Sequence, residues 1–387
     1  GLDDDDPGIV AQAAFQLARC EGGEAAVDHP AIRELRERVQ EATEDERRQI
    51  RLGFLEALEE DADERWIEVL LWLAQKPDPE VLRRVARAVM RVPDPRFVAI
   101  LVPELAVVET RATVREALSA LGPPALEALV TALEDPGTAR ELRRQLPGTI
   151  AGFRSQPACD ALVARLEREP DGLVRYRCLR ALVRLVKARP MAVSQSAIEA
   201  EIVVNLAEHF RLLALIQPLK VAHPPPEARG SAMLLRGLLQ DKVRQALERA
   251  LMLFQVLHPR EDVRGIHLAL EAEDRRRRAS AVEFLEALAL GCSERVRTML
   301  RIAIDDLSSE ERLQRLEAYV PVMPSSVQEA VRAMLDDPDS AVVALAAYHA
   351  VGLDVEPLHA KVEALTARSS IHPLVAEAAA WREASDG

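Results

Sequence analysis

The chain has 387 residues, a formal net charge of −13 and an apolar fraction of 49%, which together exclude a disordered polymer. Aromatic residues make up only 3% of it, so the core has to be built from Leu, Ala and Val, a composition that favours packed helices over sheets. The charge is uneven, because residues 1–80 hold 22 acidic and 9 basic side chains whereas residues 135–190 hold 6 acidic and 12 basic ones.

Residues 1–30 form the first predicted segment, an acidic N-terminal cap. Four consecutive aspartates at positions 3–6 are followed by Pro7, and a helix is predicted to begin near Gly8. Carboxylates placed before a helix N-terminus complement its dipole. We therefore expect this segment to be a solvated, acidic end of the molecule.

Residues 31–190 are predicted to be a first set of helical repeats. An acidic turn with an Asp-Pro or Pro-Asp step returns several times, followed by a helix with arginine near its start and then an apolar stripe. The steps between successive anchors are 32, 28 and 32 residues, with anchors at Arg83, Arg115, Arg143 and Arg175. A period in this range is typical of stacked repeat arrays and not of a compact enzyme core.

The pattern becomes less regular after Pro190. Residues 191–230 are predicted to be an irregular joint that contains one longer helix, at 194–217, and the proline-rich loop at 223–226. Residues 231–387 are predicted to be a second set of helical repeats. The last clear Asp-Pro turn of that set lies at 336–339.

The sequence forms that catalysis usually leaves are missing from the chain. There is no phosphate loop, dinucleotide-binding glycine motif, zinc-protease helix, nucleophile elbow or EF-hand loop. The four cysteines form no CxxC pair and are predicted to be reduced and mostly buried, without a zinc site. We therefore expect a protein that is not an enzyme and that has no catalytic residues, no bound metal and no cofactor.

The sequence also shows no signal peptide and no apolar run that we expect to span a bilayer, since the longest run, at 97–108, is broken by Pro103 and Glu104. The chain starts at Gly1 and not at a methionine, which is compatible with a segment cut from a longer protein.

A basic ridge between residues 140 and 189 is the candidate partner-binding site. Arg177, Arg180, Arg184 and Lys187 follow one stripe of a helix, while Val174 begins the apolar stripe that should face the neighbouring repeat. The ridge could instead be a solvated face that pairs with neighbouring carboxylates such as those at 167 and 169. The full candidate set is Arg143, Arg144, Arg154, Arg177, Arg180, Arg184 and Lys187.

Four consecutive arginines at 275–278 form a second basic cluster. They lie at a predicted helix start, after acidic residues at 271, 273 and 274. Consecutive residues point in different directions around a helix, so these four cannot all contact one ligand. We expect a solvated, ion-paired turn here.

The helix–turn units with Asp-Pro starts resemble HEAT repeats over most of the chain. A narrower resemblance rests on LPGTIAGF at 146–153, EPDGLVRY at 169–176, RALMLF with LHP at 249–259, and DRRRRASAVEFL at 274–285. Over roughly residues 80–290 these stretches are similar to the cytosolic HEAT region that follows a transporter-like membrane domain in certain bacterial proteins. That membrane domain is similar to the ATP/ADP translocase and major-facilitator group. The resemblance implies a cytoplasmic scaffold or regulator and carries over no functional residue.

These observations predict an all-α, right-handed α-solenoid of HEAT-like helix pairs. The predicted function is a non-catalytic protein–protein interaction scaffold, as the cytosolic docking or regulatory module of a transporter-like membrane protein, at the inner face of the membrane through a region outside this chain. The alternative is a solenoid that binds nucleic acid or phosphate with the ridge of residues 140–189. The acidic net charge and the scarcity of aromatic side chains argue against nucleic acid.

Overall fold

A computed structural model describes residues 4–21, 25–59, 61–75, 78–307, 309–320, 323–366 and 373–385. Regular secondary structure in these ranges is helical throughout, which confirms the predicted all-α class.

The chain divides into two compact units, residues 1–192 and 193–387. The helices of unit 1 are α1 (Pro7–Glu21), η1 (Ala26–Asp28), α2 (Pro30–Glu41), α3 (Glu44–Leu58), η2 (Glu64–Trp66), α4 (Ile67–Leu73), α5 (Pro79–Arg91), α6 (Phe97–Glu104), α7 (Arg111–Leu121), α8 (Pro123–Glu134), α9 (Arg140–Arg143), α10 (Leu146–Ile150), η3 (Ala151–Phe153), α11 (Gln156–Arg168) and α12 (Gly172–Ala188).

The turns that separate the helices of unit 1 act as caps. Asp78 accepts hydrogen bonds from the backbone N–H groups of Glu80 and Val81, at 2.8 and 3.0 Å, and Pro79 occupies the first turn of α5. Aspartate in the cap satisfies amides that have no partner inside the helix, and proline there loses no helical hydrogen bond. The Asp-Pro step thus starts the helix, as its sequence predicts.

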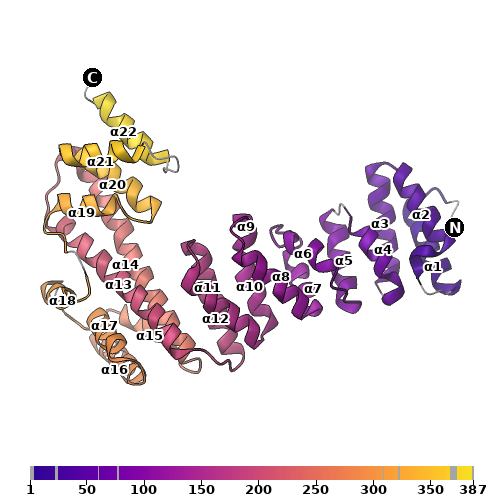
Figure 1. The fold of residues 1–387 in the computed structure, drawn as a ribbon, viewed down its shortest axis with the longest axis horizontal. Helices are drawn as coiled ribbons and strands as arrows, with labels where there is room; N and C mark the ends of the chain where they lie inside the picture. Colours follow the sequence, from indigo (N-terminus) through magenta and orange to yellow (C-terminus); the bar gives the residue numbers. More distant parts are fainter. Residues whose placement is uncertain are drawn as a thin grey trace. The chain divides into compact units, whose positions relative to one another are not determined.

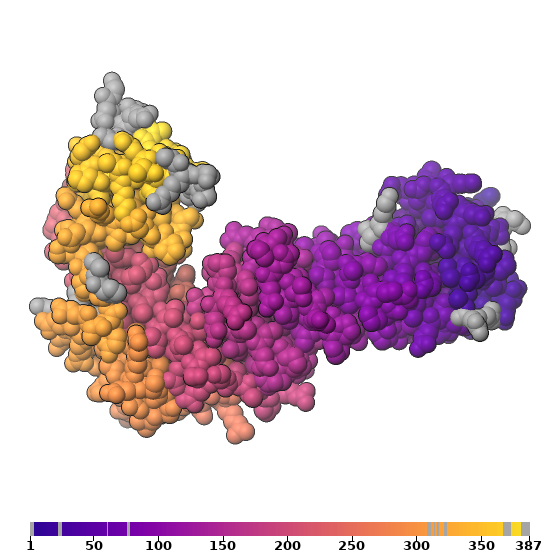
Figure 2. Space-filling view, in the orientation of Figure 1, coloured from indigo at the N-terminus to yellow at the C-terminus, as the bar shows by residue number. Residues whose placement is uncertain are grey.

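The core of unit 1 consists of apolar stripes that meet between neighbouring helices. In α5 the stripe includes Val81, Leu82 and Val85, and in α7 it includes Val114 and Leu118, all fully buried. Helices α3, α5 and α7 pack in sequence, as do α6 and α8, and α10 packs on both α8 and α12. The colours of Figures 1 and 2 accordingly advance along unit 1 from α1 to α12 without doubling back. Such neighbour-only packing defines a solenoid.

The acidic N-terminal segment contains a packed helix. The α1 side chain of Phe15 meets Phe54 and Trp66, with ring centroids 5.7 and 4.7 Å away. Helices α1 and α3 approach so closely that a Cβ atom on Gly53 would lie 2.7 Å from the carbonyl oxygen of Gly8. Of the predicted cap, residues 1–3 and 22–24 lie outside the described residues.

The repeat spacing is broken at the 28-residue step. Arg83 and Arg115 are the fifth residues of α5 and α7 and Arg175 is the fourth residue of α12, but Arg143 ends the four-residue helix α9. Between α8 and α11 the chain forms only α9, α10 and η3, each of five residues or fewer. Arg143 is therefore not equivalent to the other three anchors, and this short unit differs from its neighbours.

Unit 2 is organised around two long helices, α13 and α14, which pack along each other (Figure 1). Helices α15 and α17 contact this pair, and α16 packs between them, whereas α19 contacts α13 and α20 contacts α14. The helices of unit 2 are α13 (Gln195–Val221), η4 (Pro226–Ala228), α14 (Arg229–Leu257), α15 (Val263–Leu270), α16 (Arg275–Ala289), α17 (Glu294–Ile304), α18 (Ser309–Leu316), α19 (Val327–Met334), α20 (Ser340–Gly352), α21 (Glu356–Thr366) and α22 (Pro373–Ser385).

The division predicted from the sequence placed a joint at residues 191–230. In the structure α13 and the loop at 223–225 lie inside unit 2, whose first residue is Val193. The four-part division of the chain stays a prediction, as does the handedness of the solenoid.

Helix α13 corrects one expectation about the membrane. By length and composition it could cross a bilayer, since it has 27 residues and an 18-residue window with a mean hydropathy of 1.3. This differs from the expectation that no apolar run of the sequence could span a bilayer. In the structure 56% of this window is buried, and α13 packs on α14, α17 and α19. Core helices of soluble proteins pass the same test, so α13 alone is weak evidence for a span.

Candidate partner-binding site

Helix α12 positions most of the candidate arginines. Asp171 caps it, accepting from the backbone N–H groups of Leu173 and Val174 at 2.9 and 3.2 Å. The predicted inward stripe is buried, namely Val174, Cys178, Ala181 and Leu185. With this stripe facing the neighbouring helices, the basic stripe of α12 lies on a different side of the helix.

The three last cations of that stripe are exposed: Arg180, Arg184 and Lys187. The guanidinium of Arg180 lies 5.9 Å from the ring centroid of Tyr176, in a cation–π position. Lys187 stands in the last turn of α12, where a positive charge is favoured by the helix dipole. Within the described part of the chain none of these three forms an ion pair with a carboxylate.

Two α12 arginines reach across to the short helix α10 and the turn before it. Arg177 donates from Nη1 to the backbone oxygen of Arg144 at 2.8 Å, and Arg184 donates from Nη2 to the backbone oxygen of Gly148 at 2.9 Å. Arg144 itself is half-buried. Arg154 is exposed and has φ = 48°, a left-handed conformation that ends η3.

An arginine that the sequence analysis did not assign to the ridge completes this group. Arg115 of α7 donates from Nε to Thr149 Oγ1 at 3.2 Å and from Nη2 to Gln145 Oε1 at 3.1 Å. Its first-turn neighbour Arg111 instead donates to the backbone oxygens of Leu105 and Ala106, both at 2.7 Å. The pair at positions i and i+4 of one helix was the signal available in the sequence.

We call Arg115, Arg177 and Arg184 the open arginine cluster. Burial lowers the pKa of Arg115, and the positive charges of Arg111, Arg184 and Arg177 lower it further. None of the three cluster members has a carboxylate partner among the residues that the structure describes. The cluster therefore concentrates positive charge that the described protein groups do not neutralise.

Gly148 lies at the point where two of these side chains meet. A Cβ atom built on Gly148 would be 3.7 Å from Arg184 Nη2 and 3.8 Å from Arg115 Nη2. Both guanidinium groups thus approach one position beside α10, one from α12 and the other from α7. Together with the bond from Arg177 to the preceding turn, this makes the cluster convergent and not merely a row of surface charges.

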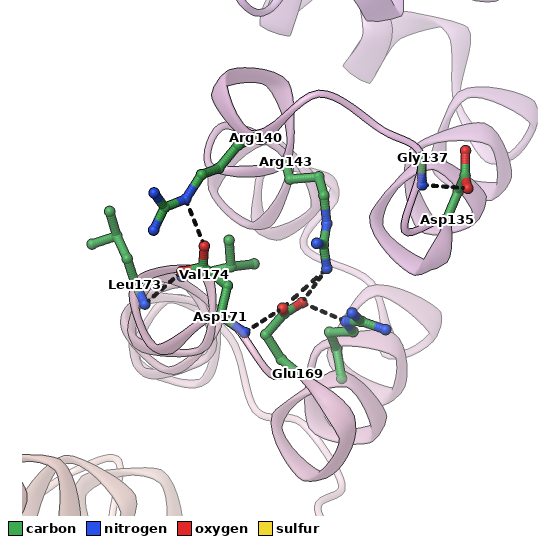
Figure 3. A network of polar contacts seen from close by, with 9 residues as sticks. Asp135, Gly137, Arg140, Arg143, Glu169, Asp171, Leu173 and Val174 are labelled. Atoms are coloured by element: carbon green, nitrogen blue, oxygen red, sulfur yellow. Dashed lines mark hydrogen bonds and ion pairs between the residues drawn. The ribbon is translucent and has the colours of Figure 1, made fainter. Parts of the chain in front are cut away.

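Arg143 lies elsewhere, in a contact that we call the closed arginine cluster. Its Nη2 donates to both carboxylate oxygens of Glu169, at 3.0 and 2.8 Å, as Figure 3 shows. Arg165 donates from Nε to the same carboxylate at 2.7 Å, and the Glu169 side chain is 0% exposed. The charge of Arg143 is therefore paired with a buried carboxylate inside the protein.

The closed cluster continues into the cap of α12. Glu169 Oε1 accepts from the backbone N–H of Asp171 at 2.9 Å, and Asp171 Oδ2 accepts from Arg140 Nε at 2.8 Å (Figure 3). Burial by itself would raise the pKa of Asp171, but the hydrogen bonds from Arg140, Val174 and Leu173 and the charge of Arg140 outweigh it, so that pKa is lowered. These contacts tie α9, α11 and α12 together.

The four arginines at 275–278 form the first turn of α16, which Asp274 caps. Asp274 accepts from the backbone N–H groups of Arg276 and Arg277, at 2.8 and 3.4 Å, and Arg278 donates to the backbone oxygen of Ala272 at 3.0 Å. Arg275, Arg276 and Arg277 are exposed. The predicted ion pairs with the acidic residues at 271 and 273 are not formed among the described residues.

The described ranges contain no group of three or more His, Cys, Asp or Glu side chains that could hold a metal ion. One open depression, about 500 Å³ in volume, lies along α8 and is lined by Pro124, Glu127, Thr131 and Asp135 among others. Its lining includes two carboxylates and the hydroxyl groups of two threonines.

Comparison with known proteins supports the repeat assignment. Residues 35–122, which run from α2 to the end of α7, match the family model described as HEAT repeats. A search of curated proteins found no match. Two crystal structures of the karyopherin Kap121p are similar to the chain at 13% identity: a mutant form, with a TM-score of 0.36, and the form bound to the extreme C-terminus of the protein phosphatase Cdc14p, with a TM-score of 0.31.

The chain covers 44% and 46% of those two karyopherin chains, while 96% and 98% of its own length is aligned. It therefore spans less than half the length of the proteins it matches. These matches do not support the narrower resemblance to a transporter-associated region.

Proposed function

We propose that the chain is a non-catalytic protein-interaction module and that its binding surface is the basic face of α12 with the open arginine cluster. The observation that carries the proposal is the contrast in pairing. Many surface arginines of unit 1 have a carboxylate partner, such as Arg96 with Glu68, but Arg180, Arg184 and Lys187 have none in the described part of the chain.

The partner's matching surface is an acidic segment. The stripe from Arg177 to Lys187 covers eleven residues, and the ten steps between its ends, at 1.5 Å each, give about 15 Å of helix. An extended acidic peptide places side chains of one face about 7 Å apart, so two or three carboxylates can meet this stripe. Arginine suits such contacts because its planar guanidinium binds a carboxylate through two hydrogen bonds.

The alternative function is binding to the phosphate backbone of a nucleic acid. The open cluster and the exposed cations of α12 favour it, since phosphates are bound by the same guanidinium groups. Tyr176, however, is occupied by Arg180, and aromatic side chains on which bases could stack are scarce in the whole chain. A protein partner is the better match.

A narrower form of the proposal concerns the place of the module in the cell. The resemblance to the cytosolic HEAT region of transporter-like proteins supports this form. In it, the chain docks a cytoplasmic partner beside a transporter-like membrane domain, at the inner face of the membrane. Copurification with solubilised membranes tests this form. Its failure would leave the interaction surface itself in place.

The surface is tested by binding of a fluorescent peptide of alternating Asp and Glu residues, measured by anisotropy. The test variant carries Arg180→Glu, Arg184→Glu and Lys187→Glu. The matched control carries Arg275→Glu, Arg276→Glu and Arg277→Glu, which changes the net charge equally at another exposed site. We expect the test variant to lose at least tenfold in affinity and the control to change less than twofold.

Equal losses in the two variants would mean that only net charge matters, and the proposed surface would be rejected. An oligonucleotide is run in parallel over a range of salt concentrations. Tighter binding of the oligonucleotide than of the peptide, with a log–log salt slope of several units, would favour the nucleic-acid alternative.

A further inference from the structure

We propose that the open arginine cluster is a receptor for one phosphorylated side chain within the partner's acidic segment. This inference rests on the proposed function, because it names the group that the same surface recognises most strongly. It places the phosphoryl group beside Gly148, between the guanidinium groups of Arg115 and Arg184, with Arg177 next to them.

The first argument is convergence. Arg115 comes from α7, and Arg177 and Arg184 come from α12, yet all three make hydrogen bonds to the short stretch from Arg144 to Thr149. A single compact group with several oxygens can contact guanidinium groups that meet at one place. A row of carboxylates on an extended peptide suits instead the straight stripe that continues to Lys187.

The second argument is charge. Three guanidinium groups carry three positive charges, Arg111 adds a fourth nearby, and no carboxylate of the described residues pairs with the cluster. A phosphorylated side chain carries a charge of about −1.5 to −2 at neutral pH, against −1 for Asp or Glu. The more highly charged group gains more from this concentration of positive charge.

The third argument is the supply of donors. Arg177 and Arg184 each donate from one nitrogen to a backbone oxygen, which fixes the guanidinium and leaves its other nitrogens without a protein acceptor among the described residues. A guanidinium has five N–H donors in a fixed plane. The bonds to Arg144 and Gly148 therefore orient the cluster in advance, and the remaining donors can meet the three oxygens of a phosphoryl group.

The test compares three short peptides of the same acidic sequence whose central residue is phosphoserine, glutamate or serine. Affinities for the whole chain are measured by fluorescence anisotropy. We expect the phosphoserine peptide to bind at least tenfold more tightly than the glutamate peptide. Arg184→Gln should remove this preference, and Arg180→Gln, an exposed position on the same helix that lies outside the cluster, should keep it.

A second variant separates loss of the site from loss of the fold. Gly148→Asp puts a carboxylate one bond beyond the Cβ position, within reach of both Arg115 and Arg184. The new side chain should neutralise the cluster from within. We expect a higher midpoint of thermal unfolding together with at least a tenfold weaker affinity for the phosphoserine peptide, a combination that misfolding cannot produce.

The outcomes distinguish this inference from the function on which it rests. Equal affinities for the phosphoserine and glutamate peptides would overturn the phosphoryl receptor and leave the acidic-segment surface standing. Failure of all three peptides to bind would overturn both. Retention of the phosphoserine preference in Gly148→Asp would place the phosphoryl group elsewhere and reject the site.

Discussion

Two groups of arginines lie close together in the sequence and have opposite environments. In the closed cluster, Arg143 and Arg165 share the buried carboxylate of Glu169. In the open cluster, Arg115, Arg177 and Arg184 bond to backbone and neutral side-chain oxygens, and no carboxylate of the described residues joins them. The same residue type thus joins helices through a buried carboxylate in one place and lacks a carboxylate partner among the described residues in the other.

The difference between the clusters lies in one acidic side chain. The Glu169 side chain is fully buried between helices, and its charge is satisfied inside the protein by the two arginines beside it and by the backbone N–H of Asp171. The open cluster has no such group, and its positive charges repel one another. Removing a charge should therefore destabilise the protein in the closed cluster and have little effect in the open one.

Glu169→Ala should give the largest effect. It leaves Arg143 and Arg165 partly buried without a counter-charge, and breaking a buried pair in this way costs about 3–5 kcal/mol in the free energy of unfolding. Urea unfolding followed by circular dichroism measures it. The control is Glu167→Ala, an exposed residue near the end of α11, which should stay within about 0.5 kcal/mol of the wild type.

Arg143→Met should give the next largest effect. Glu169 keeps Arg165 but loses two hydrogen bonds from Arg143, a loss of about 2 kcal/mol for bonds to a charged group. The same urea assay applies. If Arg143→Met were as stable as the wild type, while Arg143→Glu lowered peptide binding, Arg143 would belong to the binding surface after all.

Asp171→Ala should cost about 1 kcal/mol, because α12 loses its N-terminal cap. Asp171→Asn keeps the capping oxygen and loses only the charge. The pKa of Asp171 is lowered in the folded state, so its contribution is present above the unfolded value near pH 4 and is lost as the pH falls through the folded value. As the pH is lowered from 7 to 2, the urea midpoint of unfolding should therefore fall less steeply in Asp171→Asn than in the wild type.

Arg184→Gln should have the smallest effect on stability, within about 0.5 kcal/mol, since a lost bond to Gly148 is offset by weaker repulsion within the open cluster. Added salt screens that repulsion. Raising the salt concentration should therefore stabilise the wild type more than Arg184→Gln in thermal unfolding. A large destabilisation of the variant would show that the open cluster is structural and would weaken the proposed surface.

Several parts of this organisation could be predicted from local patterns. The Asp-Pro turn before α5 and the inward stripe of α12 were both correctly predicted, because caps and helical periodicity depend on residues within one turn or two. The exposure of Arg180, Arg184 and Lys187 follows from the same periodicity. The spacing predicts that Arg143 lies near the start of a repeat helix, like the other three anchors. That prediction is wrong, because α9 has only four residues and Arg143 is its last, and the spacing contains no sign of so short a helix.

The grouping of the arginines depended on contacts that no local pattern contains. Arg115 precedes Arg184 by 69 residues, and both approach Gly148 only because α7, α10 and α12 meet in unit 1. Glu169 and Arg143 are likewise joined only when α9 packs beside the start of α12. Whether an arginine is neutralised depends on the nearest carboxylate in space, which chain order does not reveal.

The sequence by itself determined that the chain is helical, that its helices begin at capped, proline-containing turns, and that positive charge collects between residues 140 and 189. These properties depend on backbone propensity, side-chain periodicity and composition, each of which acts within a few residues. Only the tertiary structure decided which of the positive charges are buried against Glu169 and which remain open around Gly148. The physical reason is that both charge pairing and desolvation depend on distances between helices that the packing of the whole unit sets.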